Sequence, residues 1–202
     1  MAIYTPKNFD HLIGTPGFSE ALLRNHFSLY QGYVTNSNKL IEQLHQLARE
    51  GKANTPEYAE LKRRFGWEFN GMRLHEIYFG NMTRERKEID RGSKLFQQLT
   101  GDFGSFDEWA KDFKATGALR GIGWATLYWD PVAKRLFNAW INEHDVGHLA
   151  GCPIILIMDV FEHAYMIDYG VKRADYIEAF FNAIDWEVVQ SRFDRVPMEY
   201  NF

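Results

Sequence analysis

The first half of the chain carries the pattern of two long helices. Between residues 22 and 47, apolar residues return every three or four positions, which is the spacing of one face of an amphipathic helix. Thr55-Pro56-Glu57 is a typical helix start, with a threonine cap and a proline in the first turn, and Gly80-Asn81 is a typical helix end. The short connection 48–54 favours antiparallel packing. The sequence therefore predicts an N-terminal helical hairpin.

The second half has a different pattern, which begins after a charged stretch at 83–92 that we interpret as a solvated linker. Ser105-Phe106-Asp107-Glu108 is a capping box that opens a short helix, and Gly117 can close it. Helical spacing returns over residues 175–190. Between these helices lie short β-branched or aromatic runs separated by turn residues, which predict three antiparallel strands at 121–129, 135–141 and 153–159.

These elements predict an α+β fold with two parts. A helical hairpin domain covers residues 1–88, and an α+β domain with a three-stranded antiparallel sheet covers residues 89–202. A chain of 202 residues, of which 46% are hydrophobic and 16% aromatic, can bury a substantial core.

Composition limits the chemistry and the partners. Cys152 is the only cysteine, so an intramolecular disulfide or a four-cysteine metal site within one chain is excluded. The net charge of −4 comes from interspersed charges and leaves no basic footprint for nucleic acid. No apolar run approaches the roughly 20 residues of a membrane span, and residues 1–7 lack the pattern of a secretion signal. We expect a cytoplasmic protein that binds neither membrane nor nucleic acid.

Four residues on three predicted elements suit a metal site. Asp159 and His163 follow an apolar run and lie four positions apart, so a helical turn would point both to one side. Alone this pair is a common pattern, and a single histidine on an amphipathic helix, such as His26 or His75, is more often a core residue. Together, buried polar groups on three elements each need a partner, and one shared ion supplies it.

The sequence around this pair resembles a known family. Asp159-Val160-Phe161-Glu162-His163-Ala164-Tyr165 is similar to the D-x-[WF]-E-H-A-Y signature of iron/manganese superoxide dismutases. Further similarities to that family cover nearly the whole chain, at Tyr33-Val34-Thr35-Asn36-Ser37-Asn38, Phe69-Asn70-Gly71-Met72-Arg73-Leu74-His75, Gly121-Ile122-Gly123-Trp124, Lys172-Arg173-Ala174-Asp175-Tyr176, Phe181-Asn182 and Asp185-Trp186.

The resemblance implies an enzyme that disproportionates superoxide to dioxygen and hydrogen peroxide. It implies one iron or manganese ion per subunit, held by His26, His75, Asp159 and His163, with solvent as a fifth ligand. Three neutral imidazoles and one carboxylate permit one-electron cycling, and a hydrogen bond to the solvent tunes the potential. The sequence leaves the choice between iron and manganese open.

The first helix departs from the family pattern. The first ligand of the family precedes the tyrosine of Y-V-x-N by eight positions, whereas His26 precedes Tyr33 by seven, so a gapless alignment selects Asn25. We favour His26, because offsets of seven and eight return to nearly the same helix face and imidazole binds these metals better than a carboxamide. The channel histidine of the family is replaced by Leu29 or Tyr30.

The partner of the bound solvent must also differ from that of iron-type members. Their glutamine four residues before the second ligand is Gly71 here, which has no side chain to donate. Some archaeal members place a histidine eleven residues before the ligand aspartate, and His148 has that spacing from Asp159. We therefore expect His148 to hold the solvent, with His144 as the substitute. Tyr33 is expected to hold the access channel and relay protons.

Other residues receive roles from the same resemblance. Glu162 is expected to reach His163 of the partner subunit across a two-fold interface that includes Tyr165, which implies a homodimer or a higher homo-oligomer. Arg173 is expected to support the channel and attract an anion, with a solvated surface arginine as the alternative. Three aromatic side chains are expected to wall the site, with plain core packing as the alternative: Trp124, Phe161 and Trp186.

Two other functions fit the sequence less well. A fold relative with a purely structural or interaction role would be expected to lack ligands, and all four are present. A helical di-metal carboxylate oxidase needs Glu-x-x-His pairs, and neither His75-Glu76 nor Glu162-His163 has that spacing.

Overall fold

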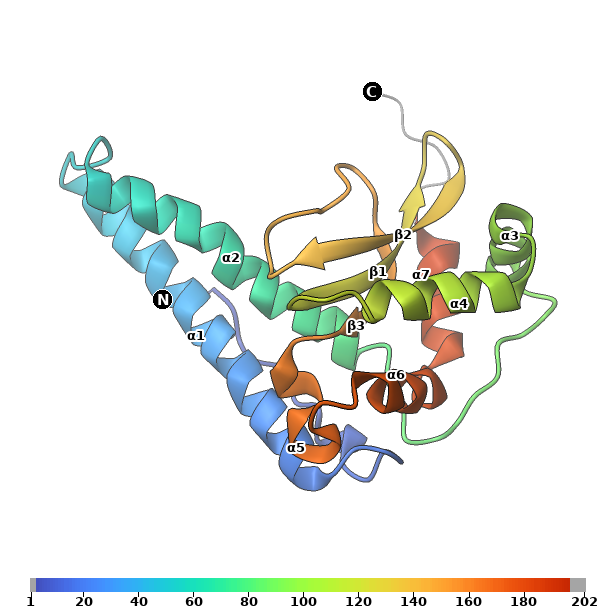
Figure 1. Cartoon of the computed structure of the whole chain (residues 1–202). Helices are drawn as coiled ribbons and strands as arrows, with labels where there is room; N and C mark the ends of the chain where they lie inside the picture. The colour runs from blue at the N-terminus through green and yellow to red at the C-terminus, as the bar shows by residue number, and fades with distance from the viewer. Residues whose placement is uncertain (1–2, 197–202) are drawn as a thin grey trace.

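The computed structural model describes residues 3–196. Residues 1–2 of the N-terminal stretch and residues 197–202 of the expected second domain lie outside the described part. Two long helices, α1 (Glu20–Arg49) and α2 (Pro56–Phe79), pack side by side and extend away from the rest of the molecule (Figure 1). The predicted hairpin is confirmed.

The ends of these helices follow the capping signals in the sequence. The Thr55 side chain accepts the Tyr58 N–H at 3.3 Å and Pro56 is the first residue of α2, while Gly80 is the C-terminal cap. Ser19 caps α1 in the same way, accepting the Leu22 N–H at 3.1 Å. Each cap satisfies one of the backbone N–H groups that a helix leaves without an internal partner.

The sheet has three antiparallel strands, β1 (Gly123–Asp130), β2 (Arg135–Asn142) and β3 (Ile154–Asp159), in the order β2-β1-β3. The central strand β1 is buried along nearly its whole length. Its register places Trp124 opposite both Ile141 of β2 and Asp159 of β3. The predicted strands are therefore confirmed, with shifts of one or two residues at their ends.

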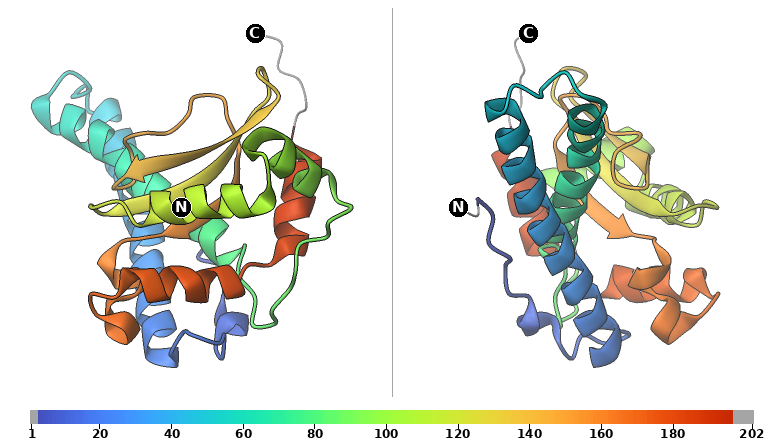
Figure 2. Two further views of the ribbon diagram at one scale, coloured as in Figure 1. Left: turned by 45° about the vertical axis from the view of Figure 1, so that its right-hand side comes forward. Right: turned by 90° about the vertical axis from the view of Figure 1, so that its left-hand side faces the viewer.

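Helices cover the sheet and connect it to the hairpin. α3 (Lys94–Phe103) and α4 (Phe106–Gly117) precede the sheet, and α4 packs on β1 and β2. α2 and α7 (Trp186–Arg195) contact β3, and α6 (Arg173–Asn182) lies before α7 (Figure 2). Three short helical segments complete the described chain: η1 (Asp10–Leu12), η2 (Glu162–Ala164) and α5 (Met166–Tyr169).

Two helix predictions need correction. The single helix expected over 175–190 is two helices, because Asp185 accepts the Val188 N–H at 3.3 Å and starts α7 after a turn at residues 183–185. α3 was not expected; Ser93 caps it by accepting the Phe96 N–H at 3.2 Å. In both cases a side-chain cap sets a boundary that apolar spacing does not mark.

The N-terminal segment lies against the first long helix. Residues 3–4 run along α1, where both backbone N–H groups donate to the Asn38 Oδ1, at 2.8 and 2.9 Å (Figure 2).

Over residues 3–196, no helix has the length and apolar character that crossing a membrane requires.

Candidate metal centre

His26 enters the site from α1. Its side chain is only 2% exposed, whereas Asn25 is exposed. The described helix is α-helical without interruption from Glu20 to Arg49, so a regular helix places the imidazole inward with the seven-residue offset from Tyr33. The choice of His26 over Asn25 is confirmed.

His75 enters from the last part of α2 and is fully buried. Its Nδ1–H donates to the Gly71 carbonyl at 2.5 Å, which leaves the lone pair on Nε2. Among the described residues, this Nε2 has no hydrogen-bond partner. A buried nitrogen lone pair without a partner is costly, and a cation beside it would satisfy it.

Asp159 and His163 enter from the end of β3 and from η2. The Asp159 Oδ1 accepts the Phe161 N–H at 2.9 Å, which turns Oδ2 toward the histidines. The Asp159 Oδ2 lies 3.1 Å from the His26 Nε2, 3.2 Å from the His163 Nε2 and 3.5 Å from the His75 Nε2. Three imidazoles thus converge on one carboxylate oxygen.

These four residues fit a single metal ion. Their ligand atoms all lie within 4.8 Å of one another, which is close to the separation of atoms that each lie about 2 Å from a shared ion. Three imidazole nitrogens and one carboxylate form a donor set suited to iron or manganese. The described residues give the His75 Nε2 no hydrogen-bond partner, and an ion at this place would satisfy it.

The protonation states also suit metal binding. Burial lowers the pKa of His26 and of His75, so both imidazoles are neutral ligands at neutral pH. Burial alone would raise the pKa of Asp159, but His163 and His26 outweigh it and hold that pKa well below its usual range. The site therefore presents the neutral nitrogens of His26 and His75 and one carboxylate, which are the ligand forms a metal requires.

A second group of side chains adjoins the ligands. The Trp124 Nε1–H donates to the His144 Nδ1 at 3.1 Å, so the proton of His144 is on Nε2. That Nε2–H donates to the Tyr33 hydroxyl at 2.8 Å, and the Tyr33 ring stacks on His75 at 5.2 Å. His144 is fully buried, and burial lowers its pKa to about 4, so its imidazole is neutral.

Gly71 makes room for this arrangement. A Cβ atom at Gly71 would lie 2.7 Å from the Tyr33 ring, closer than van der Waals contact allows. Gly71 stands where iron-type members have a glutamine. It thus leaves room for the Tyr33 ring to lie against α2.

The structure does not bring His148 to the ligands. His148 is exposed, and its Nε2–H donates to the His144 carbonyl at 2.9 Å, while its Nδ1 lies 3.2 Å from the Tyr128 hydroxyl. His144, the substitute in the sequence analysis, occupies the place beside Tyr33 and Trp124 instead. An eleven-residue spacing crosses the irregular loop between β2 and β3, where residue offset does not fix direction.

Comparison with known proteins agrees with this geometry. The sequence profile for iron/manganese superoxide dismutases, C-terminal domain, matches residues 91–192. The iron superoxide dismutase of Aquifex pyrophilus is 35% identical over 207 residues, covering 99% of this chain and 96% of that protein. The chain belongs to the iron/manganese superoxide dismutase family.

The relatives include superoxide dismutases named for iron and others named for manganese. The iron superoxide dismutase of Saccharolobus solfataricus is 34% identical, covering 89% of this chain and 87% of its own. The manganese superoxide dismutase 2 of Haloferax volcanii is also 34% identical, covering 94% of this chain and 93% of its own. The expected resemblance to archaeal members is confirmed.

Two of the three aromatic residues expected at the site adjoin the ligands of this dismutase. Trp124 lies 5.0 Å from the His75 ring, and Phe161 lies 5.0 Å from the His163 ring. Trp186 packs instead against Phe106 and Trp109, at 5.6 and 5.7 Å. Because α7 begins at Trp186, its ring joins the contacts of α4 rather than those of the metal centre.

Arg173 is tied to the backbone. Its guanidinium donates to the carbonyl oxygens of Leu119, at 2.6 Å, and Gly121, at 2.8 Å, and its Nε–H donates to the Tyr165 hydroxyl at 3.2 Å. It thereby fastens the loop before β1 to the start of α6. Glu162 is exposed beside the ligand His163, whose side chain is 23% exposed.

Tyr30, one of the two candidate replacements for the channel histidine, takes part in a different hydrogen-bond network. Tyr30 is fully buried, and its hydroxyl donates to the Glu76 Oε1 at 3.0 Å. Glu76 also binds Arg73, at 2.7 Å, and Lys7, at 3.2 Å. Tyr30 therefore belongs to a polar network behind the ligands, which the sequence did not indicate.

Proposed function

We propose that this protein disproportionates superoxide, converting two superoxide ions and two protons into one dioxygen and one hydrogen peroxide. The observation that carries the proposal is the convergence of His26, His75, Asp159 and His163, with the partnerless Nε2 of His75 at its centre. A bound iron or manganese ion would supply the one-electron oxidation and reduction. The chain holds the ligands in place through buried packing and the Gly71 hydrogen bond.

Tyr33 and His144 are proposed to manage the protons. Burial raises the pKa of the Tyr33 hydroxyl well above its usual value, so the phenol keeps its proton. The His144 Nε2–H donates to the same oxygen at 2.8 Å, and the Tyr33 ring stacks on His75. This pair can hold and pass a proton beside the ligands. We assign the role of holding the solvent to Tyr33 and His144 together: both ring nitrogens of His144 are already bonded, so the Tyr33 O–H is the donor toward the solvent, and His148 donates to the His144 carbonyl.

We further propose that the protein is a homodimer, with Glu162 reaching His163 of the partner subunit. The face around Glu162 exposes several large apolar side chains, which an interface would cover. Val171 is 90% exposed there. Arg173 and Tyr165, through their mutual hydrogen bond, would stiffen this face rather than attract the substrate. Met166, which is 43% exposed, lines the same surface hollow as Glu162 and Val171, and the exposed Ile167 follows it in the chain.

The metal and the location complete the proposal. Use of iron, manganese or either is compatible with the donor set, and a cytoplasmic location agrees with a single free cysteine, Cys152.

Elemental analysis of the purified protein, followed by superoxide decay measured on iron-loaded and manganese-loaded samples, tests the function. About one ion per chain and rapid decay with at least one metal are expected. A fully loaded protein that leaves superoxide decay at the uncatalysed rate would refute the proposal.

A further inference from the structure

The turn that carries His144 is tightly constrained. Asn142 and Val146 pair across it, with N–O distances of 2.7 and 3.3 Å. Glu143 has a φ of +49°, a left-handed conformation that is unfavourable for a residue with a side chain. Gly147 has a φ of +104°, and a Cβ there would lie 2.5 Å from the Trp140 carbonyl oxygen. A turn with this backbone needs contacts that hold it.

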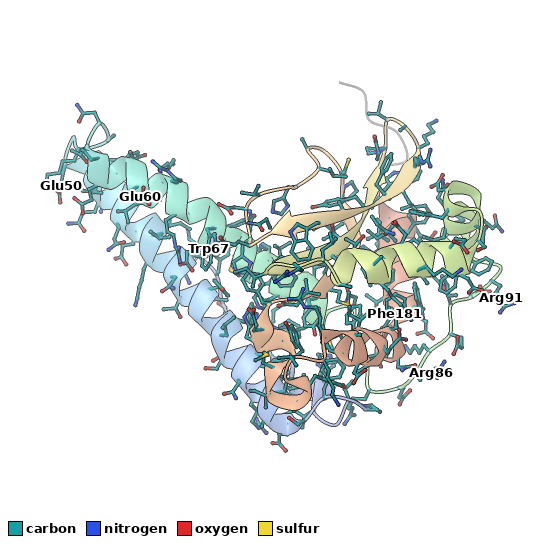
Figure 3. The ribbon with its side chains drawn as sticks, in the orientation of Figure 1. Glu50, Glu60, Trp67, Arg86, Arg91 and Phe181 are labelled. Carbon is teal, nitrogen blue, oxygen red and sulfur yellow. The ribbon has the colours of Figure 1, made fainter. Side chains whose placement is uncertain are left out.

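Trp67 of α2 supplies such a contact. Its Nε1–H donates to the Glu143 Oε2 at 3.0 Å. Its ring also lies 4.6 Å from the His144 ring and 5.5 Å from the Tyr33 ring. Figure 3 shows Trp67 on α2 near the end of β2, where the turn meets the helix. Trp67 therefore holds the turn through a hydrogen bond and also packs on His144 and Tyr33, which adjoin the ligands.

Trp67 is itself held by its neighbours on α2. The Arg64 guanidinium lies 3.8 Å from the Trp67 ring centroid, a cation–π contact. The same guanidinium donates to the Glu68 Oε1 at 2.8 and 3.0 Å, and the Glu68 side chain is only 6% exposed. The indole is thus held by Arg64, which is paired with the buried Glu68 carboxylate, as well as by Glu143.

We propose that Trp67 and Glu143 are positioning residues for superoxide turnover, and that together they set the place of the His144 ring between Trp124 and Tyr33. This inference rests on the proposed function, in which His144 acts beside the metal. Both ring nitrogens of His144 are in hydrogen bonds, at 3.1 and 2.8 Å. A displacement of about 1 Å would break either bond.

The charges of the cluster argue against a different role. Arg64 is paired with Glu68, and Glu143 adds a further carboxylate, so the group as a whole does not present a positive charge to attract superoxide. If Glu143 acts by geometry, an uncharged acceptor at that position should serve as well. Glu143→Gln keeps an oxygen acceptor and removes the charge.

The experiment uses iron-loaded protein and compares Trp67→Phe, Glu143→Ala and Glu143→Gln with the wild type. Trp67→Phe keeps a ring and removes the indole N–H. His144→Ala defines the effect of losing the positioned residue. Trp140→Phe is the matched control, because no ring contact joins Trp140 to His144 or Tyr33 in the described structure. The readouts are metal content, the midpoint potential of the iron, and the rate of superoxide decay.

We expect Trp67→Phe and Glu143→Ala to keep the metal, to move the midpoint potential toward that of His144→Ala, and to lower turnover by roughly 3–10-fold, less than loss of an outer-sphere partner itself. Glu143→Gln and Trp140→Phe should stay near the wild type. The double variant Trp67→Phe/Glu143→Ala should lose little more than either single variant, because both substitutions remove the same hydrogen bond.

Wild-type potentials in Trp67→Phe and Glu143→Ala would overturn the inference, as would an unchanged potential in His144→Ala. A Glu143→Gln variant that behaves like Glu143→Ala would show that the charge acts and not the geometry. Failure of the proposed function has a different signature, namely a metal-loaded wild type without superoxide turnover.

Discussion

The indole N–H of Trp124 donates to the Nδ1 of His144 at 3.1 Å. An indole nitrogen can only donate, so this contact places the proton of His144 on Nε2, where it faces the Tyr33 hydroxyl 2.8 Å away. Trp124 of β1 thus determines that the His144 nitrogen facing Tyr33, beside the metal ligands, is the one that carries the proton.

We predict that His144→Ala lowers superoxide turnover by about 10–100-fold, the usual effect of losing an outer-sphere partner, without loss of metal. His148→Ala should remain within roughly 3-fold of the wild type, because the hydrogen bond from His148 to His144 reaches the backbone carbonyl and not the imidazole ring. Stopped-flow superoxide decay at equal metal content measures both. A larger loss in His148→Ala than in His144→Ala would restore the assignment made from spacing.

Removing a ligand should remove the metal. His26→Ala should leave less than about one tenth of the wild-type metal content after dialysis, because outer-sphere changes alone already weaken affinity by 10–100-fold. Asn25→Ala, the neighbouring position, is exposed and should bind metal fully. Metal retained in His26→Ala and lost in Asn25→Ala would reverse the assignment.

Gly71→Ala should destabilise the protein by about 1–3 kcal/mol. The added Cβ lies 2.7 Å from the Tyr33 ring, and the ring cannot retreat without stretching its hydroxyl contact with His144, so turnover should fall as well. Gly66→Ala on the same helix has nothing within 4 Å of its Cβ and should stabilise by about 1 kcal/mol. Denaturant unfolding compares the two, and equal effects would disprove the clash.

The low pKa of His144 predicts a pH dependence of stability. Burial holds this pKa near 4 in the folded protein, against about 6.5 in an unfolded chain. Between these values the unfolded state binds the extra proton, so stability is lost as pH falls from about 6.5 to 4.

In metal-free protein, His144→Gln should reduce this slope by about 1.4 kcal/mol per pH unit. The exposed His45 provides the control variant, His45→Gln. Urea unfolding at several pH values measures the slope; an unaltered slope in His144→Gln would contradict the assignment of a buried, neutral imidazole.

The apolar face around Glu162 should form the dimer interface. Val171→Glu would bury a charge in that interface and should yield monomers in analytical ultracentrifugation, because an unpaired buried charge is costly. Val132→Glu, at another exposed apolar position that is 56% exposed, should remain dimeric. A wild type that sediments as an active monomer would rule out the interface.

Sequence alone determined the helical hairpin, the three strands and all four ligands. Helix and strand patterns are local, since apolar spacing and capping residues such as Thr55 and Ser105 act within a few positions. Asp159 and His163 are neighbours in one motif, and His26 could be chosen over Asn25 from the chemistry of the donor atom. The element patterns and the Asp159–His163 motif are local, whereas His26 and His75 were assigned as ligands because the resemblance to the dismutase family covers nearly the whole chain.

Only the tertiary structure decided which side chains surround the ligands. His144 rather than His148 reaches Tyr33 because the turn after β2 adopts a left-handed backbone at Glu143, and no residue spacing predicts the direction of such a turn. Trp67 is hydrogen-bonded to that turn although the two are 76 residues apart in the sequence. Trp186 lies outside the site because Asp185 starts a new helix. Contacts between distant segments depend on how whole elements pack, which local patterns do not specify.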